Sequence, residues 1–171
     1  LELDQILRYV FSSGTTGRRK CVGYTLHRLG QAATANPLGQ SGRSTVAGGT
    51  LGVADFSTAP GTTSPYRTLG RGGFLCFAQG PAAAIELIRL FRLENLSGSV
   101  GQIQGMLELL RGRRPLSSLR EVRIFGARLP LRVLAEVRAK LCPEVVFSYA
   151  STEMGLVAMG SGGIIERQEG V

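Results

Sequence analysis

The second half of the chain alternates short apolar runs with segments of helical period. The runs at 73–78, 120–125 and 144–148 have the length and composition of buried strands, and 96–100 is a weaker candidate. Between them, apolar positions recur three and four residues apart, which predicts helices over 82–93, 101–112 and 131–141. Strands that alternate with helices predict an α/β fold with a mainly parallel sheet. Right-handed crossovers then place helices on both faces of the sheet.

The first half of the chain is less regular. Residues 8–13 and 20–25 are strand candidates on either side of a glycine-rich loop, and 26–35 is a candidate for a short helix. From Gly39 to Gly73 the sequence is rich in glycine and shows little periodicity. Long segments without regular structure inside compact domains are often functional loops, and we expect one here.

The composition is that of a folded, basic protein. Of its 171 residues, 43% are hydrophobic, which is enough for the core of one domain or of one part of a larger domain. The formal net charge is +8, but the arginines are scattered along the chain. This pattern favours a solvated basic surface over a nucleic-acid partner. Cys21, Cys76 and Cys142 have no CxxC spacing, so they predict neither a zinc site nor a disulfide framework, and they fit the reducing cytoplasm.

The sequence also bears on targeting and completeness. No apolar stretch approaches the length of about 18 residues that a membrane span needs, and the first residues do not form a secretory signal. The chain begins without methionine and has no obvious structural punctuation at either end. We therefore expect it to be a piece of a longer protein.

The segment FSSGTTGRRK, residues 11–20, is the first candidate for chemistry. Its glycines allow several backbone N–H groups to point at one anion, its hydroxyls add donors, and Lys20 adds positive charge. The spacing is not that of a Walker A loop. Two interpretations are open at this point: a phosphate-binding loop, or an ordinary polar hairpin turn.

Two further candidates follow predicted strands. Gly126–Pro130 comes after the strand at 120–125, and Tyr149–Glu153 comes after the strand at 144–148. In an open parallel sheet, ligands bind beyond the carboxyl ends of the strands, so both segments are expected beside one crevice. The simpler interpretation of the second segment is a helix N-cap at Ser151 or Thr152.

Together and in order, these motifs resemble those of the adenylate-forming superfamily of acyl-CoA synthetases and AMP-dependent ligases. FSSGTTGRRK is similar to the phosphate loop [YF]-[TS]-S-G-T-T-G-x-P-K-G of that family. SSLREVRIFGARLP resembles its SSLRxxxxGGAPLP segment, and FSYASTEMG resembles its xxYGxTExG segment. The resemblance runs from about Tyr9 to Gly155 and is weak from about Arg28 to Arg67. It implies that residues 1–171 form a single α/β nucleotide-binding subdomain, the central part of the large N-terminal domain.

The resemblance implies a two-step reaction in the parent protein. A carboxylic acid, of the fatty, aryl or amino acid kind, attacks the α-phosphate of ATP, and the acyl-adenylate then passes its acyl group to coenzyme A or to a carrier phosphopantetheine. By similarity, Lys20, Thr152 and Glu153 form the catalytic set, in which Thr152 bonds the α-phosphate and Glu153 holds Mg²⁺. The residues that would surround the nucleotide are Ser13, Gly14, Thr15, Thr16 and Gly17 at the phosphates, Gly126 and Ala127 at the adenine and acyl pocket, and Tyr149 stacked on the adenine.

The sequence departs from the family at several positions. Arg19, Cys21, Phe125 and Ala150 stand where the family has proline or glycine, and Phe125 is expected to narrow the nucleotide or acyl pocket. The ribose-binding aspartate, the C-terminal lid domain with its lysine, and the upstream subdomain of the family have no counterpart here. We therefore expect the isolated chain to be inactive. A degenerate, non-catalytic nucleotide-binding or interaction module of the same fold is the alternative.

Two other polar residues are weighed separately. His27, the only histidine, is interpreted as a surface or helix-start residue. Asp55 is interpreted as a solvated loop aspartate, although it lies roughly where amino-acid-activating relatives carry the aspartate that binds the substrate ammonium. The acid itself cannot be named from the sequence.

Overall fold

A six-stranded sheet organises most of the molecule. The computed structural model describes residues 2–12, 19–34, 48–70 and 72–168. The strand order is β4-β3-β5-β6-β7-β8; the first five strands run parallel, and β8 pairs with β7 in the antiparallel sense. The strands are β3 (Thr50–Gly52), β4 (Leu75–Phe77), β5 (Asn95–Ser99), β6 (Glu121–Phe125), β7 (Val145–Ser151) and β8 (Gly155–Ser161). The mainly parallel sheet predicted from the sequence is confirmed.

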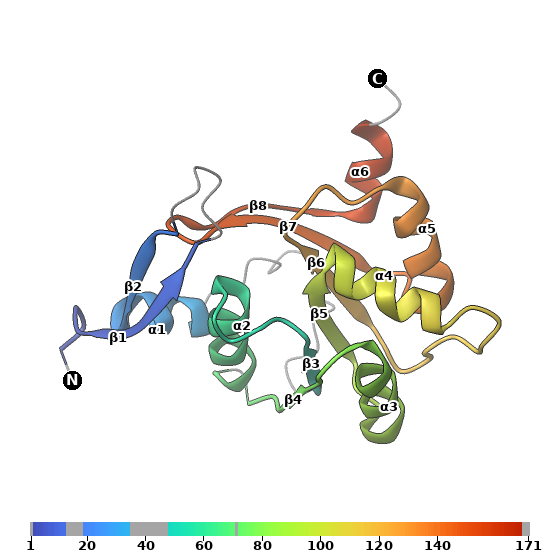
Figure 1. Ribbon diagram of the computed structural model, residues 1–171, viewed down its shortest axis with the longest axis horizontal. Coiled ribbons are helices and arrows are strands. Elements are labelled where there is room, and N and C mark those ends of the chain that lie inside the picture. Colours follow the sequence, from blue (N-terminus) through green and yellow to red (C-terminus); the bar gives the residue numbers. More distant parts are fainter. Residues whose placement is uncertain (1, 13–18, 35–47, 71, 169–171) are drawn as a thin grey trace.

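Helices flank this sheet on both faces, as predicted (Figure 1). The chain moves one way along the sheet from β3 to β4 and the other way from β4 through β7. Since crossovers are right-handed, this reversal places α2 on one face and the next three helices on the other. The helices are α2 (Ala59–Leu69), α3 (Pro81–Phe91), α4 (Val100–Leu109) and α5 (Leu131–Lys140).

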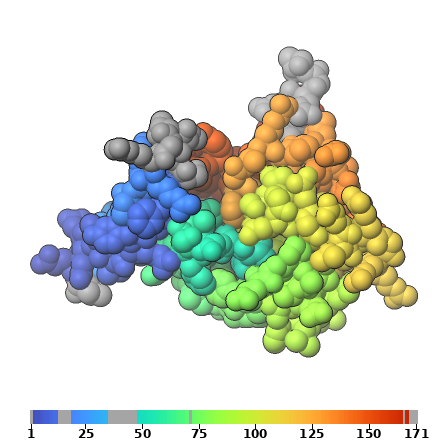
Figure 2. Space-filling view, in the orientation of Figure 1, coloured from blue at the N-terminus to red at the C-terminus, as the bar shows by residue number. Residues whose placement is uncertain are grey.

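The N-terminal part forms a small separate layer. Strands β1 (Ile6–Phe11) and β2 (Cys21–Thr25) pair as an antiparallel hairpin, and α1 (Leu26–Thr34) packs against α2. Figure 2 shows the blue hairpin beside the teal α2, away from the green and yellow helices. Tyr24 and Leu29 are fully buried in a second, smaller core between these elements. None of the helices in the described part of the chain is long and apolar enough to cross a membrane.

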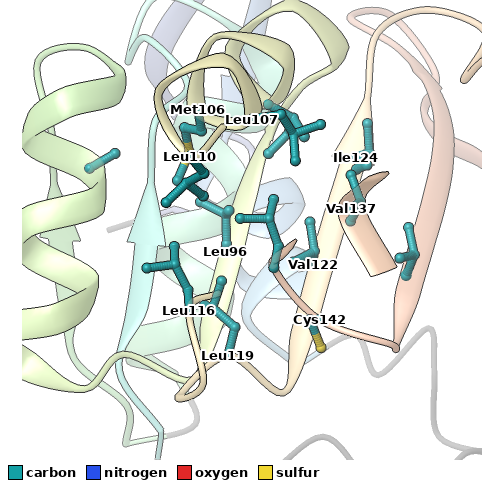
Figure 3. Packing of buried hydrophobic residues seen from close by; sticks show 14 of the residues in the cluster. Leu96, Met106, Leu107, Leu110, Leu116, Leu119, Val122, Ile124, Val137 and Cys142 are labelled. Atoms are coloured by element: carbon teal, nitrogen blue, oxygen red, sulfur yellow. The ribbon is translucent and has the colours of Figure 1, made fainter. Parts of the chain in front are cut away.

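The main core lies between the sheet and helices α3, α4 and α5. On β6, Val122 and Ile124 are fully buried toward these helices, in the same hydrophobic cluster as α4 residues such as Met106 and Leu107 (Figure 3). Because side chains alternate along a strand, Glu121, Arg123 and Phe125 point to the opposite face. The core therefore fixes one face of β6 and leaves polar side chains on the face that α2 covers.

Five elements differ from the sequence-based expectation. The segment 39–73 contains β3 and α2, where only a loop was expected; residues 39–47 lie outside the described part. The strand at 144–148 continues to Ser151, and neither β8 nor α6 (Gly162–Gln168) was expected. A three-residue strand and a helix with an internal proline, Pro65, give almost no periodic signal.

Candidate active site

A cavity of about 670 Å³ opens at the carboxyl ends of the parallel strands. It lies where the direction of the chain along the sheet reverses, between β3 and β5, which is where ligands bind in open α/β sheets. Its walls come from strands that are far apart in sequence. The lining includes Ser12 and Lys20 from the N-terminal hairpin, Ala54 and Asp55 after β3, Ser99 at the end of β5 and Gln102 in α4, Phe125 at the end of β6 and Gly126 after it, and Tyr149 to Glu153 on β7 and its turn.

The cavity brings together most of the predicted site residues that lie in the described chain. Lys20, Gly126, Tyr149, Thr152 and Glu153 all line it. Ala127 is exposed and does not belong to the lining. The loop residues Ser13, Gly14, Thr15, Thr16 and Gly17 lie outside the described residues. The expectation that Gly126–Ala127 and Tyr149–Glu153 lie side by side at the cavity is therefore met by Gly126 and not by Ala127.

The turn after β7 is a hairpin turn. Met154 N–H donates to Ser151 Oγ at 3.0 Å, and β8 then returns antiparallel to β7. The interpretation of Ser151 or Thr152 as a helix N-cap is therefore wrong, since a strand follows. The β7–β8 hairpin extends over α2 toward the β1–β2 hairpin (Figure 1). It carries Thr152 and Glu153 to the mouth of the loop that holds Lys20.

Two buried or half-buried donors fix the backbone at Thr152. Tyr24 Oη donates to the Thr152 carbonyl oxygen at 3.0 Å, and Arg28 Nη2 donates to the same oxygen at 2.9 Å. The Arg28 guanidinium also lies 4.0 Å from the centre of the Tyr24 ring. Burial raises the pKa of Tyr24, against the opposing effect of Arg28, so the phenol keeps its proton and donates at neutral pH. Sequence reasoning missed both residues, because no motif marks them.

Lys20 and Glu153 meet across the cavity. Lys20 Nζ lies 3.8 Å from Glu153 Oε1, and the two side chains are 67% and 42% exposed. Ser12 N–H donates to the Lys20 carbonyl at 2.9 Å, which closes the base of the loop. An ion pair this exposed stabilises the fold by little, so both charges are accessible to a ligand. The strands on either side of residues 13–18 thus pair as a hairpin, and Ser12 and Lys20, at the ends of these strands, line the cavity.

The donor set at the cavity fits Mg²⁺ better than a transition metal. Among the described residues, no three His, Cys, Asp or Glu side chains gather as a metal site. Glu153 and Asp55 are the two carboxylates on the described lining, and Glu153 is the one that faces Lys20. Mg²⁺ is commonly held in this way, by one or two carboxylates together with phosphate oxygens and waters.

Glycine is required at one predicted position of the site. Gly126 has φ +96°, a conformation that residues with a Cβ rarely adopt. It lies at the end of β6 and turns the chain sharply beside the cavity. The backbone conformation therefore favours glycine at this position whether or not a ligand binds.

Asp55 lies on the lining at the start of α2. Ser57 N–H donates to Asp55 Oδ1 at 2.7 Å and lowers the pKa of this exposed carboxyl, so it is charged at neutral pH. Thr58 caps α2 by accepting from Gly61 N–H at 3.2 Å. A Cβ on Gly61 would lie only 1.9 Å from the Asp55 carbonyl oxygen, so the glycine allows α2 to pack against this turn. The aspartate is a turn residue, as interpreted, and it also borders the cavity.

The floor of the cavity contains a motif that the sequence analysis did not use. Ser99 Oγ accepts from Gln102 N–H, and Gln102 Oε1 accepts from Ser99 N–H at 2.9 Å, which forms a capping box at the start of α4. The Gln102 amide also donates to the Val53 carbonyl and so ties α4 to the end of β3. The S-x-x-Q spacing before an apolar helix was the available signal. His27 is exposed near the start of α1, as interpreted.

A second cavity, of about 260 Å³, adjoins the first. The two share Phe125, Ala150 and Ser151 as well as the first residues of α2. Phe125, expected to narrow a pocket, therefore stands at the boundary of both cavities. The smaller cavity extends over the α2 face of the sheet, between β5–β8 and helices α1 and α2.

Comparison with known proteins gives one family and one fold. Residues 1–170 match the family model described as AMP-binding enzyme. The hybrid PKS-NRPS synthetase TAS1 of Gloeophyllum trabeum is 32% identical over 152 residues, which cover 86% of this chain and 9% of that protein. O-succinylbenzoate coenzyme A synthetase of Bacillus subtilis, solved with ATP and magnesium ion, has a TM-score of 0.81 at 20% identity over 98% of this chain and 35% of its own. The luciferase-like enzyme of the mealworm Zophobas morio has a TM-score of 0.73 at 18% identity over 98% of this chain and 40% of its own.

Proposed function

Because the chain belongs to the AMP-binding enzyme family, we propose that it is the ATP-binding part of a ligase that activates a carboxylic acid as its acyl-adenylate. The observation that carries the proposal is the convergence of three separate sequence motifs on one cavity at the carboxyl ends of the strands. The chain spans between 9% and 40% of the relatives above, so the remaining parts of the site would come from the rest of a longer protein.

The charges at the cavity suit an attack on phosphorus. A carboxylate oxygen of the acid bonds to the α-phosphorus of ATP, the bond to the bridging oxygen breaks, and pyrophosphate leaves. Catalysis of such a step depends on positioning and on neutralising the phosphate charge. Lys20 would neutralise charge on the β- and γ-phosphates together with the loop Ser13–Gly17. Mg²⁺ held by Glu153 would supply further positive charge between the phosphates.

The hairpin turn after β7 would position the α-phosphate. The Thr152 hydroxyl would donate to it, while the Thr152 carbonyl is already occupied by Tyr24 and Arg28. This division keeps the backbone rigid and leaves the side chain for the substrate. Tyr149, whose side chain is 61% exposed, has a free ring face that the adenine would cover. Gly126 would allow close approach of the nucleotide base.

The acceptor of the acyl group would be coenzyme A or a carrier phosphopantetheine, supplied outside this chain. The alternative is a relative that keeps the fold and the cavity but has lost turnover. Since Lys20, Thr152 and Glu153 are all present in the sequence, the catalytic interpretation is the better supported of the two.

The test is acid-dependent exchange of labelled pyrophosphate into ATP by the full-length protein. The assay uses Mg²⁺ and a panel of fatty, aryl and amino acids, with and without each acid. Exchange that requires both the acid and Mg²⁺ would support the proposal. Tight ATP binding without exchange for any acid would favour the non-catalytic alternative.

A further inference from the structure

The smaller cavity is lined by cationic side chains. Arg28 from α1, Arg67 from α2 and Arg123 from β6 all line it, and no Asp or Glu stands among the described residues of its wall. The remaining wall is formed mainly by hydroxyl and apolar side chains. An anion is therefore the charged ligand that this wall suits best.

Arg123 is the arginine of this wall that comes from the sheet itself. It lies on a central strand, on the face opposite the main core, in register with Ser97 of β5. Its side chain is only 15% exposed, and its Nη2 donates to Glu121 Oε1 at 2.8 Å. Its Nε is buried and has no hydrogen-bond partner among the described residues. The ion pair with Glu121 therefore satisfies Nη2 of the guanidinium and leaves the buried Nε donor unpaired. An unpaired buried donor destabilises the folded state.

The partners of Arg28 do not neutralise it. Its guanidinium lies against the Tyr24 ring and donates to the Thr152 carbonyl, and both of these partners are neutral. A planar guanidinium with spare donors binds a carboxylate well, often through two parallel hydrogen bonds. Arg28 is therefore not neutralised by these two partners, and Arg123 keeps an unpaired Nε donor.

We propose that this cavity binds the acid that is activated, and that the acid carries a second carboxylate, which pairs with Arg123. The inference rests on the proposed function. The cavity adjoins the nucleotide cavity at Phe125 and Ala150, so one small molecule spans both. Its reacting carboxylate bonds to the α-phosphorus and pyrophosphate leaves, while the second carboxylate is unchanged and stays ionised.

The geometry limits the size of this acid. Arg123 lies two residues before Phe125 on β6, which places it about 7 Å deeper along the strand than the boundary between the cavities. The volume of about 260 Å³ is slightly below the ~300–1,000 Å³ of common ligand pockets. A dicarboxylic acid of about four to seven carbons, or an aryl dicarboxylic acid, fits these limits better than a long fatty acid.

Matched pairs of substrates test the inference in the full-length protein. Each dicarboxylic acid is compared with its monoamide, which has the same shape without the second charge: succinate, glutarate, pimelate, terephthalate, aspartate and glutamate. The readout is kcat/KM for the acid in pyrophosphate exchange. We expect at least one diacid to exceed its monoamide by about 10- to 100-fold, the value of one charge-assisted contact.

A variant then assigns the preference to Arg123. Arg123→Met is combined with Glu121→Gln, so that no carboxylate is left half-buried without its partner. Arg89→Met, on the exposed face of α3, is the control for loss of an arginine. In the double variant, the ratio of kcat/KM for the preferred diacid to kcat/KM for its monoamide should fall to about one, whereas the Arg89→Met control should keep the ratio of the unmodified protein.

The outcomes separate this inference from the proposed function. Exchange with monoamides or monocarboxylic acids but no preference for any diacid would overturn the inference and leave the ligase intact. A diacid preference that persists in the folded double variant would also overturn the assignment to Arg123. Absence of exchange with every acid would overturn the proposed function, and the inference with it.

Discussion

Replacing Lys20 with alanine tests whether this side chain binds phosphate or only pairs with Glu153. The structural pair is weak, because its atoms are 3.8 Å apart and its side chains are 67% and 42% exposed. Exposed pairs of this kind contribute about 0–1 kcal/mol, and this one belongs at the low end. The melting temperature of Lys20→Ala should therefore fall by less than about 2–4 °C.

The functional loss should be much larger than the loss of stability. A charge-assisted hydrogen bond to phosphate is worth about 1.5–3 kcal/mol, so kcat/KM for ATP should fall by about 10- to 150-fold. The assay is pyrophosphate exchange in the full-length protein at varied ATP concentration. Melting temperatures are measured on the same preparations.

The chain offers a matched control in its other lysine. Lys140 lies at the end of α5 and donates to the Arg113 carbonyl at 3.0 Å, outside both cavity linings. Lys140→Ala removes the same charge but should leave the ATP kinetics unchanged. If Lys20→Ala and Lys140→Ala have equal kinetics, Lys20 does not bind phosphate and the assignment of the loop fails.

Three more predictions follow from the same site. Tyr24→Phe should lower the free energy of unfolding by about 0.5–1.5 kcal/mol in urea denaturation, because the Thr152 carbonyl keeps Arg28 as a donor. Burial raises the pKa of Tyr24, so the folded state holds this proton more tightly than the unfolded state does. The free energy of unfolding should therefore fall as the pH rises through that raised pKa, and this alkaline loss should be smaller in Tyr24→Phe. An equal alkaline loss in both proteins would contradict this. Glu153→Gln should raise the Mg²⁺ concentration needed for half-maximal exchange by more than ~10-fold, which is the loss of metal affinity when an outer-shell partner is removed. An unchanged Mg²⁺ titration would exclude Glu153 as a ligand. The isolated 171-residue chain should bind nucleotide weakly and release no pyrophosphate above a Glu153→Gln control. The reason is that positioning of the reactants by the rest of the longer protein is worth about 7–11 kcal/mol of the barrier. Steady turnover would show that the chain holds a complete site.

The elements that the sequence predicted are those whose burial has a clear period. Helix α4 places Ile103, Met106, Leu107 and Leu110 toward the core at helical spacing, and the structure buries all four. Strand β6 is a short apolar run between helices α4 and α5, and the predicted part of β7 is an apolar run that follows α5. In both cases the side chains that form the core also carry the periodic signal.

The elements that were missed have weak local signals and depend on tertiary contacts. Strand β3 has three residues and gains its stability from neighbours on both sides, β4 and β5. Helix α2 buries Gly61 and Thr62 rather than large apolar side chains, and it contains Pro65. Strand β8 is largely exposed, so it has no alternating apolar pattern. Its pairing with β7 cannot be read from composition alone.

The residues of the candidate site likewise fall into those that local motifs predicted and those that only the fold brings into place. Lys20, Gly126, Tyr149, Thr152 and Glu153 were found because they belong to local motifs. Their supports come from other parts of the chain: Tyr24 and Arg28 lie more than a hundred residues from Thr152. Arg123 was part of a predicted strand, but only the fold shows which face of the sheet it occupies.

The most direct test of the central claim is a crystal structure of the full-length protein with a non-hydrolysable ATP analogue and Mg²⁺. The account predicts that the phosphates lie at Lys20, that the metal is bound by Glu153, and that the adenine rests against Tyr149 and Gly126. The account would be contradicted by a nucleotide bound elsewhere in the protein, with the cavity at the carboxyl ends of β3, β5, β6 and β7 left empty.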